Sequence, residues 1–186
     1  MASDRQEQRD SLIELLNEEI NLTEADHARN ASSAWTATVF ASAGLLAVGT
    51  QVPDVLFVRV LAVVVIAVVA LAALMFIGMQ FGKRWSCADT SDVLRSLRSR
   101  LRAEGIDVAE EDLAVPSGSV FPNLIVNRLK PDTEIARERS AAVRAALAHL
   151  IAPWRWSAID PRARSEAACY VAVVVSAVIS AVAAFS

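Results

Sequence analysis

Few residues in this chain are of the types that carry chemistry. The sequence has two histidines, His27 and His149, and two cysteines, Cys87 and Cys169. No CxxC or HExxH motif and no glycine-rich phosphate loop is present. No pair of carboxylates lies in an apolar setting that would suit acid–base catalysis. The sequence therefore predicts neither an enzyme nor a metal or cofactor site.

One spacing resembles a known catalytic pattern. Arg144 and His149 match the Arg-x4-His pattern of HEPN ribonucleases. The pattern is short, and alanine-rich helices produce it by chance, so we expect no nuclease here. The two cysteines fall near the predicted cytoplasmic membrane face, where a reducing environment favours free thiols.

The apolar residues that must position any site are concentrated in blocks. The chain has 186 residues, of which 54% are hydrophobic, and a mean hydropathy of +0.39. Between positions 35 and 82 the only charges are Asp54 and Arg59, and residues 167–186 carry none. An uncharged stretch of about 20 residues is long enough to cross a bilayer as a helix. These blocks exclude an ordinary soluble enzyme, a disordered tail and a disulfide-rich secreted module.

The blocks predict an all-α integral membrane protein with three transmembrane helices. Pro53 lies in the only connection between the first two spans, so these form a tight hairpin, and the third span is at the C-terminal end. The predicted regions are a cytoplasmic amphipathic helix at 1–34, the hairpin at 35–82, a small cytoplasmic helical region at 83–166 and a C-terminal span at 167–186.

Flanking basic and aromatic residues predict the orientation. Positively charged residues beside spans favour the cytoplasmic side, and tryptophans favour the water interface. The predicted interface anchors are Lys83, Arg84, Trp85, Trp154 and Trp156. We therefore expect the N-terminus and residues 83–166 to be cytoplasmic in a bacterial inner membrane, with the C-terminus outside. For the Trp154–Trp156 pair, burial in a domain core is the alternative.

The predicted cytoplasmic helices carry an apolar stripe and an arginine stripe. Leu94, Leu97 and Leu101 recur at helical spacing after a natural cap at Thr90 or Ser91. A second helix is expected to start at Asp132 or Thr133. The adjacent arginines could bind lipid phosphate or another anion, or could simply form a solvated face. This candidate face consists of Arg95, Arg98 and Arg102. No block of like charge is long enough to indicate nucleic-acid binding.

Small residues in the spans indicate close helix packing. Gly78 and Gly82 form a GxxxG motif at the inner end of the second span. Every fourth residue of the third span is also small: Ala172, Ser176, Ser180 and Ala184. A homo-oligomer would bury these faces, and packing within one subunit is the alternative.

Two charges lie at the opposite end of the hairpin. Asp54 and Arg59 are about one helical turn apart. A charge at the end of a span usually extends to the interface. In a ring of subunits the same pair would be a candidate pore mouth.

The layout also resembles a known group of proteins. The sequence Glu24-Ala-Asp-His-Ala-Arg29, with Ala25-Asp26 followed by a basic residue, precedes a first span rich in small residues. A hairpin, a cytoplasmic segment and a last span follow. This arrangement resembles the small bacterial membrane effectors of the SLATT and Pycsar-effector type, and the octameric RipA-type membrane proteins. The resemblance implies a self-associating inner-membrane protein that a signal of the nucleotide type would trigger to permeabilise the membrane.

Two functions are therefore predicted. The first is a homo-oligomeric membrane protein that forms or gates a pore or lesion in bacterial antiviral defence or stress. The second is a non-conducting membrane scaffold or regulator that recruits a cytoplasmic protein partner.

Overall fold

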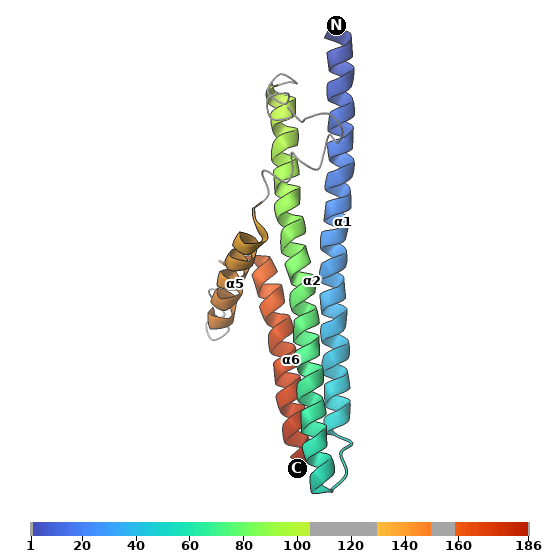
Figure 1. Ribbon diagram of the computed structural model, residues 1–186, viewed down its shortest axis with the longest axis vertical. Coiled ribbons are helices and arrows are strands. Elements are labelled where there is room, and N and C mark those ends of the chain that lie inside the picture. Colours follow the sequence, from blue (N-terminus) through green and yellow to red (C-terminus); the bar gives the residue numbers. More distant parts are fainter. Residues whose placement is uncertain (1, 105–129, 150–158, 186) are drawn as a thin grey trace. The chain divides into compact units, whose positions relative to one another are not determined.

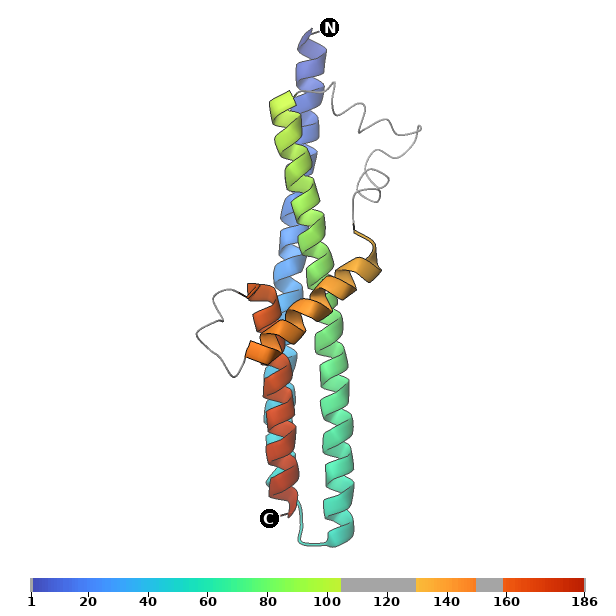
Figure 2. The same ribbon diagram turned by 90° about the vertical axis from the view of Figure 1, so that its left-hand side faces the viewer.

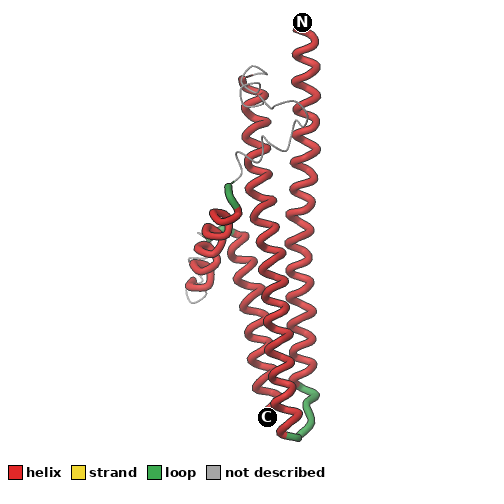
Figure 3. Tube along the Cα trace, in the orientation of Figure 1, coloured by secondary structure: helices red, strands yellow, loops and turns green. Residues whose placement is uncertain are grey.

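The computed structural model describes residues 2–104, 130–149 and 159–185. Over these ranges every regular element is a helix (Figures 1 and 3). The four helices are α1 (Ala2–Gly49), α2 (Leu56–Glu104), α5 (Asp132–Ala148) and α6 (Pro161–Phe185). The described ranges thus confirm the predicted all-helical class.

The first two helices are much longer than predicted. The sequence suggested separate amphipathic helices joined to spans, but α1 and α2 run without a break through both kinds of segment. The predicted helix start at Thr90 or Ser91 is wrong. The Thr90 hydroxyl donates to the Ser86 carbonyl 3.0 Å away, one turn back inside the helix. A hydroxyl used in this way does not cap a new helix.

The later helices begin at clear local signals. α5 starts at Asp132, as predicted. α6 starts at Pro161, six residues before the predicted span. Asp160 caps α6, since its Oδ1 atom accepts a hydrogen bond of 2.7 Å from the Arg162 backbone N–H. Proline suits the first helical position because its missing N–H would have no intrahelical partner there.

The described residues belong to two compact units. The polar unit consists of residues 1–28 and 84–135, and the apolar unit consists of residues 29–83 and 136–186.

In the polar unit, the first part of α1 pairs antiparallel with the last part of α2. Their buried seam contains the predicted stripe of α2, Leu94, Leu97 and Leu101, together with Leu16 and Ile20 of α1. Polar contacts flank the seam, including a 3.1 Å hydrogen bond from Arg84 Nε to His27 Nε2. The predicted stripe of α2 is therefore buried against apolar residues of α1, which accounts for its spacing.

In the apolar unit, α1, α2 and α6 pack side by side (Figure 1). The buried core is aliphatic and aromatic, with Leu45, Ile66, Ile77, Phe81 and Val173 among its members. Three described helices are long and apolar enough to cross a membrane. The outward surface is apolar too, as Phe40, Met75 and Val182 are 73%, 69% and 63% exposed. These features are those of an all-α membrane protein.

The small residues of α6 are used inside the chain. Ser176, Ser180 and Ala184 are buried, and Ala172 is partly buried. A Cβ atom added to Gly49 of α1 would lie 2.6 Å from the Ser180 Cα. The backbones of α1 and α6 can approach this closely only because Gly49 has no side chain. This row therefore packs within the chain, and a role for it between subunits stays a prediction.

The remaining helix, α5, crosses α6 obliquely instead of lying along it (Figure 2). Only Val143 and Ala146 of its 17 residues are buried. The apolar contact of α5 with the rest of the apolar unit is therefore small.

Candidate functional site: a buried ion pair between α5 and α6

A buried carboxylate and a guanidinium meet where α5 packs on the apolar unit. Glu166 lies in the second turn of α6, and its side chain is only 1% exposed. Arg139 of α5 reaches it with a side chain that is 21% exposed. Arg139 Nε lies 3.0 and 3.1 Å from the two Glu166 carboxylate oxygens, and Nη2 also donates to Oε1. The pair is thus bidentate, the strongest geometry available to these groups.

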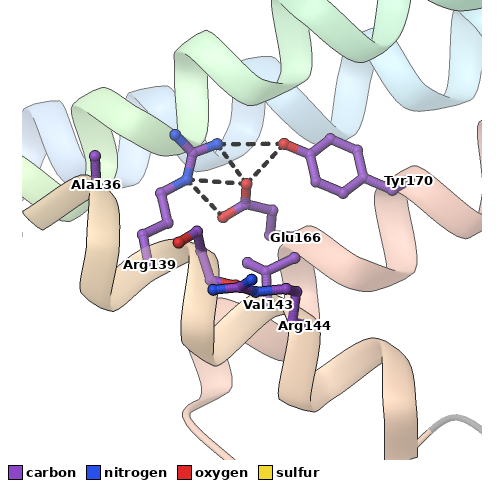
Figure 4. A pocket seen from close by; sticks show the side chains of 7 residues that line it. Ala136, Arg139, Val143, Arg144, Glu166 and Tyr170 are labelled. Atoms are coloured by element: carbon purple, nitrogen blue, oxygen red, sulfur yellow. Dashed lines mark hydrogen bonds and ion pairs between the residues drawn. The ribbon is translucent and has the colours of Figure 1, made fainter.

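Two further groups complete the site, and one of them, Tyr170, is drawn beside Arg139 and Glu166 in Figure 4. The Tyr170 hydroxyl donates to Glu166 Oε1 at 2.7 Å and accepts from Arg139 Nη2 at 3.2 Å. Arg139 Nη2 also donates to the Gly78 carbonyl of α2 at 2.7 Å. We call these four groups the Arg139 cluster: the side chains of Arg139, Glu166 and Tyr170, and the Gly78 carbonyl. The cluster joins three helices through one guanidinium.

Helical spacing and missing side chains make this geometry possible. Glu166 and Tyr170 are four residues apart, so they lie on one face of α6. A Cβ at Gly78 would lie 3.0 Å from the Tyr170 hydroxyl, and one at Gly82 would lie 3.1 Å from Arg139 Nη1. Both glycines of the GxxxG motif therefore make room for the cluster within this chain. A role for them between subunits stays a prediction.

The electrostatics hold the arginine in its charged form. Burial lowers the pKa of Arg139, but the hydrogen bond to Glu166 and the negative charge of Glu166 together raise that pKa by a larger amount. The net pKa of Arg139 therefore lies above its usual value. Removing either partner would leave the other as an uncompensated charge, which is costly in a buried setting. The cluster therefore makes the position of α5 depend on a charge in α6.

A cavity of about 260 Å³ opens beside the cluster. It is lined by Ala136, Arg139, Ser140, Val143, Arg144, Glu166 and Tyr170. Arg144 Nε donates to the Ser140 carbonyl at 3.1 Å, so that guanidinium is directed partly to its own helix. The described residues hold no group of His, Cys, Asp and Glu that could bind a metal ion.

The predicted arginine face of α2 is not a continuous open surface. Arg95 forms a 2.5 Å ion pair with Glu24 of α1, and Arg98 Nη1 donates to Asn17 Oδ1 at 2.8 Å. The Arg102 side chain is exposed. Two of the three arginines thus contact α1 within the polar unit, and anion binding by this face stays a prediction.

The charges predicted as a pore mouth are bonded to each other and to α6. Arg59 Nη2 lies 2.7 Å from Asp54 Oδ1. Its Nη1 donates to the Phe185 carbonyl at 3.1 Å, so Arg59 satisfies a free carbonyl at the C-terminal end of α6. A cation in this position also interacts favourably with the helix dipole. A place at a pore mouth stays a prediction.

The predicted interface anchors differ in their surroundings. Lys83 is exposed, whereas Arg84 bonds His27 and Trp85 is only 7% exposed. The indole of Trp85 is therefore packed within the chain and not laid on an outer surface, unlike a typical belt residue. Trp154 and Trp156 lie outside the described residues.

Comparison with known proteins finds no matching family model, no similar curated protein and no similar solved structure. The resemblance to SLATT, Pycsar-effector and RipA-type proteins stays a prediction from layout.

Sequence reasoning did not single out Arg139, Glu166 or Tyr170. Two signals were present: Glu166 directly precedes the uncharged stretch, and Tyr170 is the one tyrosine in the sequence. An ionisable side chain next to a span indicates a functional contact. No such signal marks Arg139, because nothing local distinguishes it from the other arginines of its region.

Proposed function

We propose that this chain is a non-conducting anchor in a bacterial inner membrane that recruits a cytoplasmic protein partner through its polar unit. The observation that carries the proposal is that small-residue faces of the spans pack against other parts of the same chain. Ser180 packs against Gly49, and Gly78 and Gly82 make room for Arg139, all within one chain. The small-residue faces of α2 and α6 are thus already occupied.

The outward surfaces of the apolar unit also favour an anchor. The exposed side chains of the spans are mainly valine, leucine, phenylalanine and methionine, which suit contact with membrane lipid and not with a water-filled channel. The polar unit, by contrast, exposes charged residues. Five exposed acids of α1 are Glu7, Asp10, Glu14, Glu18 and Glu19. A charged helical surface of this kind suits recognition of a protein partner.

The proposed orientation places the N-terminus and residues 83–166 in the cytoplasm. It depends on the positive charges beside the spans. Phe185 and the Asp54 turn meet at one end of the apolar unit, so the proposal assigns the C-terminus to the same side as that turn. Reporter fusions at each terminus test this: a C-terminal fusion active on the cytoplasmic side would overturn it.

A second candidate is a homo-oligomeric pore acting in defence or stress, opened by a nucleotide-type signal. One observation favours it. Ala43, Gly44 and Ala47 form an exposed small-residue face on α1, and nothing lies within 4 Å of a Cβ added at Gly44. A second copy of the chain could pack closely there.

Dye release from liposomes separates the two candidates. We expect the full chain to retain a trapped small dye, and the nanodisc particle to have the mass of a single chain. Release of dye together with a multi-chain mass would overturn the anchor and support the pore. In that case Gly44→Leu should suppress both, while Gly49→Leu would instead damage packing within the chain.

Recruitment is tested with two variants of the polar unit. Leu94 is fully buried in its seam, whereas Ser96 is exposed on the same helix. Leu94→Asp should abolish capture of a specific cytoplasmic protein without preventing membrane insertion, and Ser96→Asp should retain capture. Equal capture by both variants would contradict recruitment through this unit.

A further inference from the structure

We propose that α5 is a reversibly docked helix that covers Glu166, held in place by the bidentate Arg139–Glu166 pair. The inference does not rest on recruitment or on conduction, because it concerns only the contact of α5 with α2 and α6.

The first argument is the small apolar contact of α5. Two of its 17 residues are buried, and most of its side chains are exposed. Docking by apolar burial alone is therefore weak. The Arg139 cluster adds polar bonds that join α5 to both α2 and α6.

The second argument is the burial of the acceptor. Glu166 is 1% exposed, and its described partners are Arg139 and Tyr170. The Tyr170 hydroxyl is neutral and cannot balance the carboxylate charge. If Arg139 leaves, Glu166 must gain water or a proton, because an unpaired buried carboxylate is strongly disfavoured. The structure around it must then open.

The third argument is that one guanidinium makes both contacts. Arg139 Nη2 bonds the Gly78 carbonyl of α2 as well as the α6 side chains. If Arg139 leaves, its polar bonds to both helices are therefore lost at once. A contact that breaks at all points together favours two states, docked and undocked, over gradual loosening.

The docked helix also covers the GxxxG motif. The Arg139 guanidinium lies 3.1 Å from the position of a Cβ at Gly82 and 3.6 Å from one at Gly78. Undocking of α5 uncovers this face of α2 together with Glu166. While α5 is docked, Glu166 and the GxxxG face therefore cannot contact anything else.

The test measures the exposure of Glu166 and of the α5 backbone in the full chain in nanodiscs. Glu166 is probed by its modification with a water-soluble carbodiimide and an amine, read by mass spectrometry. The α5 backbone is probed by hydrogen–deuterium exchange. In the chain without substitutions we expect no detectable modification of Glu166 and slow exchange in α5.

Three variants decide the outcome. Arg139→Ala should raise Glu166 modification to at least ten times the detection limit and remove α5 protection, while α1, α2 and the end of α6 stay protected. Arg139→Lys keeps the charge without the bidentate geometry, so its Glu166 modification should be intermediate. The matched control is Arg137→Ala, which removes an exposed arginine of the same helix. Its Glu166 modification and its α5 exchange should equal those of the chain without substitutions.

The proposal is overturned if Glu166 stays unreactive and α5 stays protected in Arg139→Ala, or if Arg137→Ala has the same effect as Arg139→Ala. If Arg139→Ala loses protection in every helix, Arg139→Lys decides instead. Raised Glu166 modification with protected spans then supports reversible docking. Glu166 modification no higher than in the chain without substitutions refutes it.

Discussion

The Arg139–Glu166 pair should respond unequally to loss of its two partners. Arg139→Ala leaves Glu166 charged and 1% exposed, whereas Glu166→Gln leaves Arg139 with a side chain that is already 21% exposed. Breaking a buried pair costs about 3–5 kcal/mol. The arginine can turn its head toward water, so the glutamine variant should cost less, about 1–2 kcal/mol.

The double variant measures the coupling free energy between the two side chains. Arg139→Ala combined with Glu166→Gln removes the charge that the single arginine variant strands. We therefore expect the pair of substitutions to cost at least about 1 kcal/mol less than the sum of the two single costs, as is usual for residues in direct contact. Additive costs would show that the two side chains do not stabilise each other.

Unfolding of the purified chain in detergent micelles, titrated with a denaturing detergent and followed by far-UV circular dichroism, measures these costs. A loss of about 3 kcal/mol corresponds to a roughly 150-fold change in the ratio of folded to unfolded chains. The reasoning is refuted if Glu166→Gln proves as costly as Arg139→Ala. Such a result would mean that the arginine is as costly to leave unpaired as the carboxylate.

Other sites allow equally direct tests. Gly49→Ala should destabilise the same unfolding reaction by about 1–3 kcal/mol, because its Cβ would lie 2.6 Å from the Ser180 Cα. Gly44→Ala is the matched control: its Cβ meets nothing within 4 Å, so it should be neutral or stabilising. Arg59→Ala should speed deuterium exchange in the last turn of α6, because it removes the donor to the Phe185 carbonyl, whereas Arg59→Lys should retain part of the protection. Unchanged exchange in Arg59→Ala would show that this contact does not hold the end of the helix.

The local composition of the chain was sufficient for predicting the kinds of helix it contains. The uncharged blocks gave the three apolar helices, and Asp132 marked the start of α5. The positions at which one helix ends and the next begins were harder to predict. Thr90 has the residue type of a helix cap, yet its hydroxyl bonds back to Ser86 inside a continuous helix. A serine or threonine can do either, and the choice depends on whether the surrounding segment has packing partners as a helix.

The candidate site itself was not predictable in this way. Gly78 and Gly82 were recognised as a packing motif, but the residue that fills their space is Arg139, 61 positions from Gly78 along the chain. Glu166 could be suspected from its place beside an uncharged stretch. Its partner could not, because the sequence of α5 offers several similar arginines, and nothing local shows that Arg139 is the one that pairs with Glu166.

Hydropathy, charge and helix length are properties of short segments, so the sequence alone determined that this chain is helical and that three of its helices are apolar enough to cross a membrane. The identity of neighbours is not a local property. Only the tertiary structure decided that the small residues of α6 face α1, that Arg59 bonds the last turn of α6 and that Arg139 pairs with Glu166. Each of these contacts requires two segments distant in sequence to meet in one register, and helical periodicity sets the face of a helix without setting its partner.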